Sequence, residues 1–382
     1  MKALKKLLYL LQLQEYQTSR YEAWLKRFAI QDLVERKNQL HLTARIIFTL
    51  AIALIIVPLL GSQKAVALAN EILRQLFWVA ETIIVLLAQI KLSFYPQLIK
   101  IVITGSYGKT TFKEMLTLVL AAKYSVLETP GNINTRLGIA LTILRQLHRP
   151  HQILIVEAGA YRLGEIRQIC QLIRPQFGVI TIFGWMHLER FGNSANIRTA
   201  KMELIPFIKN KQRLFLPAQD HRFLDFEHTC RKIAAQLEID PTVAFSRLKE
   251  FTSPEHRLSV RKINRNLTLL DDAYSSNPES FRRGLKELEK FKNYQKIIVT
   301  PGMVELGDKQ ASLNRQLAQE AAKTVDVFVI VGQTNKKALG EGARGAKIVL
   351  MNREESFVEK LTGLLRPPAV VLLENDLPDH YF

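Results

Sequence analysis

The fold class of this chain is decided by the stretch Thr104-Gly105-Ser106-Tyr107-Gly108-Lys109-Thr110-Thr111. An apolar run rich in isoleucine and valine precedes it at 98–103 and predicts a buried strand, and the spacing of residues 112–122 predicts a helix. A glycine loop between a strand and a helix binds phosphate, because its backbone N–H groups and the helix N-terminus face the anion. We therefore expect Lys109 to contact the β- and γ-phosphates of ATP, and Thr110 to offer its hydroxyl to Mg²⁺.

Further apolar runs extend this pattern along the chain. Strands are expected at 153–156, 178–183 and 213–216, with helical stretches between them. A second alternating block follows Ser253, with strands expected at 267–270, 297–300, 325–331, 348–351 and 369–373. Strands that alternate with helices form a mostly parallel sheet covered on both faces. We expect an α/β protein with a P-loop-type central domain in 95–252 and a second α/β domain in 253–382.

Residues 42–94 form the most apolar part of the chain. The uncharged run from Ile46 to Leu60 approaches, with its flanks, the roughly 20 residues that a spanning helix needs. A second run, 76–90, is interrupted by Glu81, whose carboxylate makes this span marginal alone. We expect a helical transmembrane hairpin with a short external loop near 61–71. The alternative is a buried or interfacial helical pair in a soluble protein.

Charge predicts which side of the membrane the chain occupies. Residues 1–41 carry more basic than acidic side chains, which favours the cytoplasmic side. The phosphate loop also has to be cytoplasmic, because ATP is there, and two spans or none satisfy both conditions. We expect a basic, amphipathic helical N-terminus that lies on the inner leaflet or packs on protein. The catalytic domains would face the cytoplasm from the inner, cytoplasmic membrane.

Composition limits the partners. A formal charge of +18 attracts nucleic acid, anionic lipid or phosphorylated substrates, unless the surface is basic without a specific partner. Basic clusters interleaved with aromatic residues do not occur in the sequence, so we do not expect nucleic acid as a partner. The two isolated cysteines, Cys170 and Cys230, predict neither a disulfide framework nor a zinc site, and they fit a reducing compartment.

The loop departs from the full pattern of phosphate loops, because Ile103 stands where a first glycine belongs. The shortened form resembles that of the Mur ligase superfamily, ATP-dependent enzymes that join a carboxylate to an amine. Other stretches similar to motifs of that family follow in order: Gly-Asn-Ile-Asn at 131–134, Glu-Ala-Gly at 157–159, His-Leu-Glu-Arg-Phe-Gly at 187–192, Ala-Lys-Met-Glu at 200–203 and His-Arg at 256–257. Two later stretches resemble the MurF branch: Asp-Asp-Ala-Tyr-Ser-Ser-Asn-Pro at 271–278 and Gly-Met-Val-Glu-Leu-Gly at 302–307. The resemblance covers about 101–331 and implies that the C-terminal α/β domain is Rossmann-like.

The resemblance also implies a set of site residues. Those expected to bind ATP are Gly105, Ser106, Tyr107, Gly108, Lys109, Thr110, Thr111, Arg257 and Asp272. Those expected to bind Mg²⁺, as two ions, are Thr110, Glu157, His187 and a carbamylated Lys201. Asn132 and Asn134 would face the acyl substrate, and the catalytic set would be Lys109, Glu157, His187, Lys201 and Arg257. Each of these residues also has a purely structural interpretation, such as a turn, a cap, a surface charge or a structural histidine.

The implied activity is that of a MurF-type ligase acting through an acyl phosphate in cell-wall peptide synthesis. Three features differ from the family: the hairpin stands in place of the uridine-nucleotide domain, the asparagine that contacts adenine is not found in 220–251, and Leu-Glu-Asn-Asp-Leu-Pro at 373–378 replaces a lysine-glycine-serine motif. We expect a membrane enzyme that joins a carboxylate-bearing peptide or lipid-linked precursor to an amino acid or dipeptide. The alternatives are a membrane-anchored polyglutamate-type amide ligase and a nucleotide-binding membrane scaffold that does not ligate.

Overall fold

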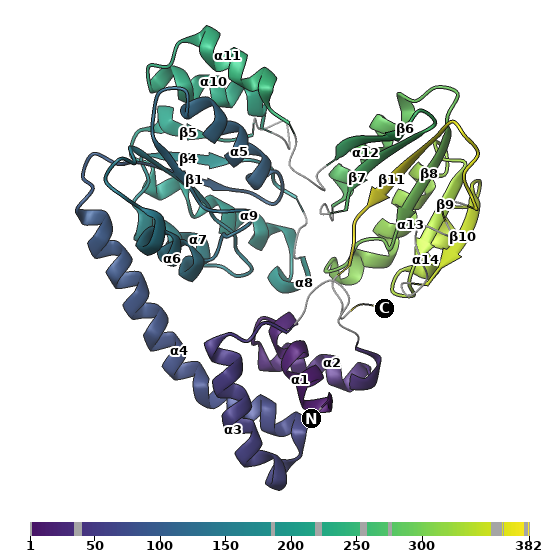
Figure 1. Ribbon diagram of the computed structural model, residues 1–382, viewed down its shortest axis with the longest axis horizontal. Coiled ribbons are helices and arrows are strands. Elements are labelled where there is room, and N and C mark those ends of the chain that lie inside the picture. Colours follow the sequence, from purple (N-terminus) through teal and green to yellow (C-terminus); the bar gives the residue numbers. More distant parts are fainter. Residues whose placement is uncertain are drawn as a thin grey trace. The chain divides into compact units, whose positions relative to one another are not determined.

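The computed structural model of the protein describes residues 2–33, 40–184, 188–217, 224–252, 258–273, 277–352, 361, 363–377 and 381. The chain divides into two compact units, one of residues Met1–Ile83 with Leu377–Phe382 and one of residues Ile84–Asp376 (Figure 1). The first unit is helical, and the second contains both sheets.

The helices of the first unit end in an unexpectedly tight hairpin. They are α1 (Lys2–Leu13), α2 (Thr18–Arg27), η1 (Ile30–Asp32), α3 (Ala44–Leu60) and the start of α4 (Ser62–Ser93). Gly61 alone, with φ +73°, separates α3 from α4. The predicted external loop at 61–71 is therefore wrong: residues 62–71 are helical, since they contain no glycine or proline and include three alanines, which favour helix.

Helix α1 is a core helix of the first unit. Its Leu7, Leu8, Leu10 and Leu11 are at most 2 % exposed and pack in one cluster with residues of α2, α3 and α4. Of the two placements expected for the N-terminus, packing on protein is thus the one that these side chains adopt. A buried network of polar contacts lies at the turn between α1 and α2.

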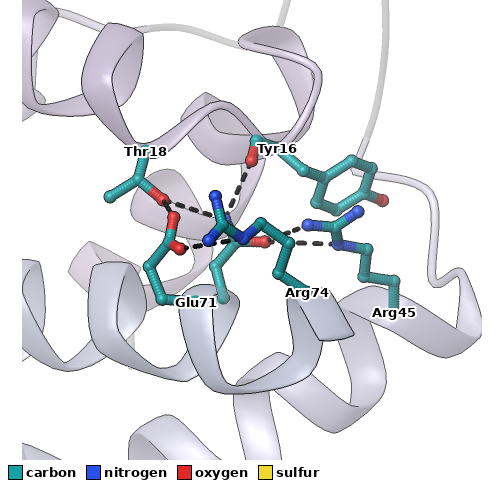
Figure 2. A network of polar contacts seen from close by, with 6 residues as sticks. Tyr16, Thr18, Arg45, Glu71 and Arg74 are labelled. Atoms are coloured by element: carbon teal, nitrogen blue, oxygen red, sulfur yellow. Dashed lines mark hydrogen bonds and ion pairs between the residues drawn. The ribbon is translucent and has the colours of Figure 1, made fainter. Parts of the chain in front are cut away.

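Asn70 of α4 is the centre of that network. Figure 2 labels four residues of the same network, Tyr16, Thr18, Arg45 and Glu71. Asn70 is fully buried, its side-chain amide donates to the Tyr16 carbonyl at 2.8 Å, and its side-chain oxygen accepts from the Arg45 guanidinium at 2.7 Å. The Arg45 guanidinium also lies 4.3 Å from the centre of the Tyr16 ring. Beside it, Thr18 donates to Glu71. The network fixes the α1–α2 turn to both α3 and α4.

The first sheet of the second unit has the predicted parallel architecture. Its strands are β1 (Ile99–Thr104), β2 (Val126–Glu128), β3 (Ile153–Glu157), β4 (Phe177–Ile180) and β5 (Leu214–Phe215), in the order β2-β3-β1-β4-β5 and all parallel. The elements that connect them are α5 (Lys109–Leu120), α6 (Arg136–Gln146), α7 (Glu165–Ile173), α8 (Leu188–Phe191), α9 (Ser194–Met202), η2 (Ile205–Phe207), η3 (Lys211–Arg213), α10 (Phe226–Gln236) and α11 (Pro241–Glu250). One apolar core joins the sheet to α6, α7 and α9, and the other joins it to α5, α10 and α11 (Figure 1).

The end of α4 belongs to the domain built on this first sheet. Val85, Ala88 and Leu92 lie in the core with α6, and the Lys91 ammonium donates to the Leu144 carbonyl at 2.9 Å. The part of the predicted second span from Ile84 onward is therefore a helix packed on protein. Within the described residues, α4 is the one helix long and apolar enough to cross a membrane, and α3 is shorter, with 17 residues.

The second sheet is also mostly parallel, as predicted. Its strands are β6 (Ser259–Asn264), β7 (Leu267–Asp272), β8 (Gln295–Thr300), β9 (Val327–Val331), β10 (Lys347–Met351) and β11 (Ala369–Glu374), in the order β10-β9-β8-β11-β7-β6. Only β6 runs antiparallel to its neighbour among these paired strands. The helices are α12 (Pro278–Glu289), η4 (Gly307–Lys309), α13 (Gln310–Ala321) and α14 (Lys336–Gly342). Both sheets thus present the carboxyl ends of parallel strands, where ligands bind in α/β proteins.

Candidate active site

The glycine loop joins β1 to α5, and two of its glycines are sterically required. Gly105 has φ +145°, and a Cβ there would lie 2.1 Å from the Thr181 hydroxyl oxygen. Gly108 has φ +74°, in the left-handed region, and a Cβ there would lie 2.6 Å from the Phe226 ring. Any other residue would strain the backbone and displace a neighbour at both positions. Both glycines are therefore required by the close packing of the loop against Thr181 and Phe226.

Lys109 and Ser106 are both held within the loop. The buried Lys109 ammonium donates to the Gly105 carbonyl at 3.1 Å, so it lies over the loop rather than in solvent. The Ser106 hydroxyl is 3.0 Å from both the nitrogen and the carbonyl oxygen of Gly184, which anchors the loop to the segment after β4. A buried lysine ammonium beside a glycine loop at the N-terminus of a helix is a candidate anion site.

Glu157 brings three predicted residues together at the carboxyl end of β3. Its buried carboxylate accepts from the Thr110 hydroxyl at 2.7 Å and from the Asn134 side-chain amide at 3.1 Å. Asn132, from the same loop as Asn134, is exposed. Mg²⁺ takes one or two carboxylates together with hydroxyl, water and phosphate oxygens, so this pair of oxygen ligands fits that ion. Within the described residues there is no group of three or more His, Cys, Asp or Glu side chains that could hold a metal ion.

Lys113 is a site residue that the sequence did not reveal. It is a fully buried lysine on α5 whose ammonium donates to the carbonyls of Thr129 and, at 2.7 Å, Gly131. The Glu128 carboxylate lies 3.8 Å away. Lys113 thereby ties the phosphate helix to the loop that carries Asn134. One signal could have identified it, namely a lysine one helical turn after Lys109, next to the buried Phe112.

Lys201 occupies an unusual environment for a lysine at the end of α9. Its side chain is buried, and that burial, together with the charge of Lys109, lowers the pKa of Lys201 to about 7. Glu165 and Glu203 oppose the shift. The Glu203 carboxylate accepts from the Gly164 and Arg167 backbone N–H groups at 2.7 and 3.1 Å, so it is engaged by the start of α7. A large fraction of the Lys201 amine is consequently neutral near pH 7, the form that reacts as a nucleophile.

Of three further predicted residues, the structure describes Asp272 alone. His187 and Arg257 are outside the described residues. Asp272 is fully buried at the end of β7 and accepts a hydrogen bond from the Ser280 hydroxyl in the first turn of α12. This bond fits the structural interpretation of Asp272, and its expected contact with the ribose stays a prediction.

Glu374 was also missed by the sequence reasoning, although its segment was noted. It pairs in register with Asp272, on the neighbouring strand. It is fully buried, and neither of its carboxylate oxygens has a hydrogen-bond partner in the described part of the chain. Burial and the nearby Asp272 raise the pKa of Glu374 well above its usual value. The carboxyl edge of the second sheet therefore holds a buried acid with a raised pKa, Glu374, beside a hydrogen-bonded one, Asp272.

Comparison with known proteins matches this architecture. Residues 103–259 match the Mur ligase middle domain, and residues 256–374 match the Mur ligase, glutamate ligase domain. The chain belongs to the Mur ligase family. Its similarity to curated MurF proteins supports the MurF-like branch of that family.

The relatives show how far the similarity extends. The UDP-N-acetylmuramoyl-tripeptide–D-alanyl-D-alanine ligase of Bacillus subtilis is 25 % identical over 267 residues, 56 % of this chain and 58 % of that protein. The Treponema pallidum protein of the same name is 35 % identical over 128 residues, 34 % of this chain and 28 % of that protein. The chain thus spans less than two thirds of the length of these relatives.

Solved structures show the same fold. MurF from Acinetobacter baumannii superposes with a TM-score of 0.68 at 23 % identity, covering 77 % of each chain. MurF ligase from Thermotoga maritima in complex with ADP gives a TM-score of 0.66 at 23 % identity, covering 78 % of this chain and 80 % of that one. The predicted order of two α/β domains is confirmed by these likenesses.

Proposed function

We propose that this chain is an ATP-dependent ligase of the MurF type, which forms an amide bond between a carboxylate and an amine. The observation that carries the proposal is the contact of Glu157 with both Thr110 and Asn134, directly beside the glycine loop. It joins a metal-binding carboxylate, a phosphate loop and an amide expected at the acyl substrate. A phosphate loop used only for binding would not need the last of these.

The proposed reaction has two steps. The substrate carboxylate attacks the γ-phosphorus of ATP, the bond to the β–γ bridging oxygen breaks, and ADP leaves an acyl phosphate behind. The amine then attacks the acyl carbon, loses a proton, and expels inorganic phosphate as the amide forms. Lys109 and the loop N–H groups stabilise the charge that builds on the transferring group. Bound Mg²⁺ supplies further charge neutralisation, and Thr110 and Glu157 would hold it.

The remaining predicted residues complete the proposed site. Gly105, Ser106, Tyr107, Gly108 and Thr111 belong to the loop that would surround the phosphates of ATP. Arg257 and Asp272 are proposed nucleotide ligands, His187 a proposed metal ligand, and Asn132 and Asn134 proposed contacts of the acyl substrate. These roles rest on the family resemblance.

We also propose that Lys201 is carbamylated. Its neutral amine would add to the carbon of CO₂ and lose a proton, which gives a carbamate anion able to steer a second Mg²⁺. The lowered pKa of Lys201 supports this step, because the nucleophilic form of the amine is abundant near neutral pH. Protein equilibrated with ¹³C-bicarbonate should show a carbamate carbon signal by NMR that is missing in Lys201→Met. The same signal in both proteins would contradict the proposal.

ADP release is the test of the ligase function. The full chain should release ADP only when a carboxylate substrate, for example a UDP-muramoyl tripeptide, and an amine such as D-alanyl-D-alanine are both present. Lys109→Met and Glu157→Gln should abolish release. Turnover with glutamate or polyglutamate instead would favour the capsule-type alternative. Absence of turnover with every pair of substrates would favour the nucleotide-binding scaffold and contradict the proposal.

The proposed location of the protein is the cytoplasmic membrane. α4 is long and apolar enough to cross a bilayer, and large apolar side chains of α3 and α4 are exposed. We propose that the chain is attached to the cytoplasmic membrane, with its α/β domains in the cytoplasm, and that a lipid-linked cell-wall precursor is an acyl substrate to test beside the soluble one. Recovery of the full chain with washed membranes after cell lysis would agree with attachment, and recovery only in the soluble fraction would contradict it.

A further inference from the structure

The hairpin of α3 and α4 leaves one apolar stripe of each helix exposed. On α3 the stripe follows the helical period and consists of Ile47, Phe48, Leu54, Ile55 and Leu59. On the first-unit part of α4 it consists of Leu68, Ile72, Leu76, Val79 and Ile83. None of these positions is polar or charged. Stripes of this size on a water-soluble surface mark a site of interaction.

The remaining faces of the hairpin are covered by α1 and α2. Ile46 and Ala53 of α3, with Ala65 and Val66 of α4, are fully buried in one cluster with the leucines of α1. The hairpin is therefore covered on one side by protein of its own unit and uncovered on the other.

The position of α2 decides whether such a hairpin can span a bilayer. Near the open end of the hairpin, the Gln12 amide donates to the His41 carbonyl at 3.0 Å and the Tyr16 hydroxyl lies 2.9 Å from that of Thr43. Near the tip, the Tyr21 hydroxyl of α2 donates to the carbonyl of Gln63, two residues after Gly61, at 3.2 Å. The N-terminal helices thus accompany the hairpin from its open end to its tip.

A spanning hairpin would carry α2 into the hydrocarbon. The charged residues of α2 are Arg20, Glu22, Lys26 and Arg27. Charged side chains within hydrocarbon are expensive and rare, because they lose their hydration. Since α2 is bonded close to the tip, its charges and the tip belong on the same, aqueous side of the membrane.

We propose that the first unit is a membrane-surface domain. The exposed stripes of α3 and α4 insert into the cytoplasmic leaflet of an anionic bilayer without crossing it, and α1 and α2 stay on the water side. Helices that lie in the interface bury their apolar face about 5–10 Å into the headgroup and acyl boundary. This inference rests on the proposed membrane attachment and is independent of the proposed ligase reaction.

Charge favours lipid over a second copy of the chain as the occupant. Residues 1–83 contain eleven lysines and arginines against six acidic residues, and α1 contains three lysines and no acid. Two copies would bring these excess positive charges together, whereas an anionic leaflet would attract them. Exposed Trp78 on α4 suits the headgroup level, where aromatic rings accumulate.

Vesicle flotation of the purified full chain tests the surface. The wild type should float with protein-free vesicles of phosphatidylglycerol and phosphatidylcholine, and Ile55→Glu with Leu59→Glu should reduce binding at least tenfold. The matched control is Val243→Glu with Phe245→Glu, two exposed apolar residues of α11, which should bind like the wild type. No binding of the wild type to vesicles, or a wild-type dimer that the α3 variant converts to a monomer, would overturn the inference.

Cysteine labelling tests the topology separately. The native Cys170 and Cys230 are buried, so Gln63→Cys places a single accessible thiol near the tip. A membrane-impermeant maleimide should label this thiol in inverted membrane vesicles and leave it unlabelled in intact spheroplasts. The control Lys211→Cys, at an exposed position in the domain of the first sheet, should give the same result. Labelling of Gln63→Cys in intact spheroplasts would show a spanning hairpin. ADP release is not needed for either readout, so failure of the ligase proposal would leave this test intact.

Discussion

Lys113 is a buried lysine beside the phosphate loop, and its removal should destabilise the neighbouring loop that contains Gly131 and Asn134. Lys113→Met leaves the carbonyls of Thr129 and Gly131 without their ammonium donor. Each unsatisfied buried polar group costs about 1–3 kcal/mol, so we expect a loss of that order in the free energy of unfolding. Because the loop positions Asn134, the KM for the acyl substrate should rise more than kcat falls.

The control for this prediction is Lys286→Met, which removes an exposed lysine of α12. Urea unfolding and ADP release as a function of acyl-substrate concentration measure the two effects. Equal unfolding free energies for the two variants would refute the role given to Lys113.

Lys201 should make stability depend on pH. Its folded pKa, about 7, lies below the unfolded value of 10.5, so the unfolded chain binds more protons between these two values. Stability should therefore rise as pH increases from about 7 to about 10.5, and Lys201→Met should flatten that rise. Urea unfolding in CO₂-depleted buffer at several pH values measures it. A wild-type profile parallel to that of Lys201→Met would contradict the shift.

Glu374 should change the pH dependence of stability in the direction opposite to Lys201. Its pKa is raised in the folded state by burial and by Asp272, so the folded chain keeps a proton that the unfolded chain loses above its ordinary pKa. Stability should fall as pH rises through that range. Glu374→Gln keeps the neutral shape at every pH, and its advantage over the wild type should grow from pH 5 to pH 8 in urea unfolding. A constant difference would mean that Glu374 is ionised throughout.

At the scale of elements, the start of α5 depends on a glycine for two separable reasons. Gly108 and Gly164 both precede a helix with positive φ, at +74° and +93°. Only Gly108 also faces an obstacle, the Phe226 ring at 2.6 Å from its Cβ position, while Gly164 has open space. Replacing either glycine by alanine should lower the free energy of unfolding by about 1 kcal/mol or slightly more, because the backbone is strained at positive φ.

Gly108→Ala should therefore weaken ATP binding well beyond Gly164→Ala, because the added methyl group must displace Phe226 or the loop. Titration with ATP, followed by calorimetry, compares the two variants directly. Similar ATP affinities would mean that the loop accommodates the methyl group and that the close approach to Phe226 is not required.

The elements that the sequence predicted correctly are those with a single dominant signal. The buried runs at 98–103 and 153–156 became β1 and β3, since continuous isoleucine and valine in a short stretch suit a strand covered on both faces. Strand β6 was missed, because Ser259–Asn264 is an edge strand whose side chains are mostly exposed, with two of them, Arg261 and Lys262, charged. Its pairing with β7, a tertiary contact, makes it a strand.

The site could be predicted only where residues are adjacent in sequence or match a motif. The glycine loop needed Gly105 and Gly108 in fixed positions, and both are required by the fold. Lys113 and Glu374 were not predicted, because their roles depend on contacts with residues far away in the sequence. Lys113 donates to carbonyls 16 and 18 residues away, and Glu374 lies beside a residue of a neighbouring strand. Burial of a charged side chain is a property of the folded chain, which composition does not reveal.

At the scale of the whole molecule, hydropathy located the apolar region but did not distinguish a spanning hairpin from helices packed on protein. Residues 42–94 contain enough apolar side chains for two spans, yet some of these side chains pack on α1 and others on the domain of the first sheet. Apolar side chains are equally suited to lipid and to protein, and a hydropathy scale does not distinguish them. The distinction came from the contacts of polar residues, Asn70 and Tyr21, whose partners show what lies beside the hairpin.

A surface-bound unit predicts a characteristic response to salt. The charge of +18 contributes attraction to anionic lipid, which is screened as the Debye length falls from about 10 Å at 0.1 M salt to about 3 Å at 1 M. Insertion of the α3 and α4 stripes is not screened, because it depends on apolar area. Flotation with phosphatidylglycerol-containing vesicles should therefore weaken with salt to a plateau, and binding to pure phosphatidylcholine vesicles should be weaker and nearly independent of salt. Complete release at 1 M salt would mean that charge alone holds the chain on the membrane and that the stripes stay outside the lipid.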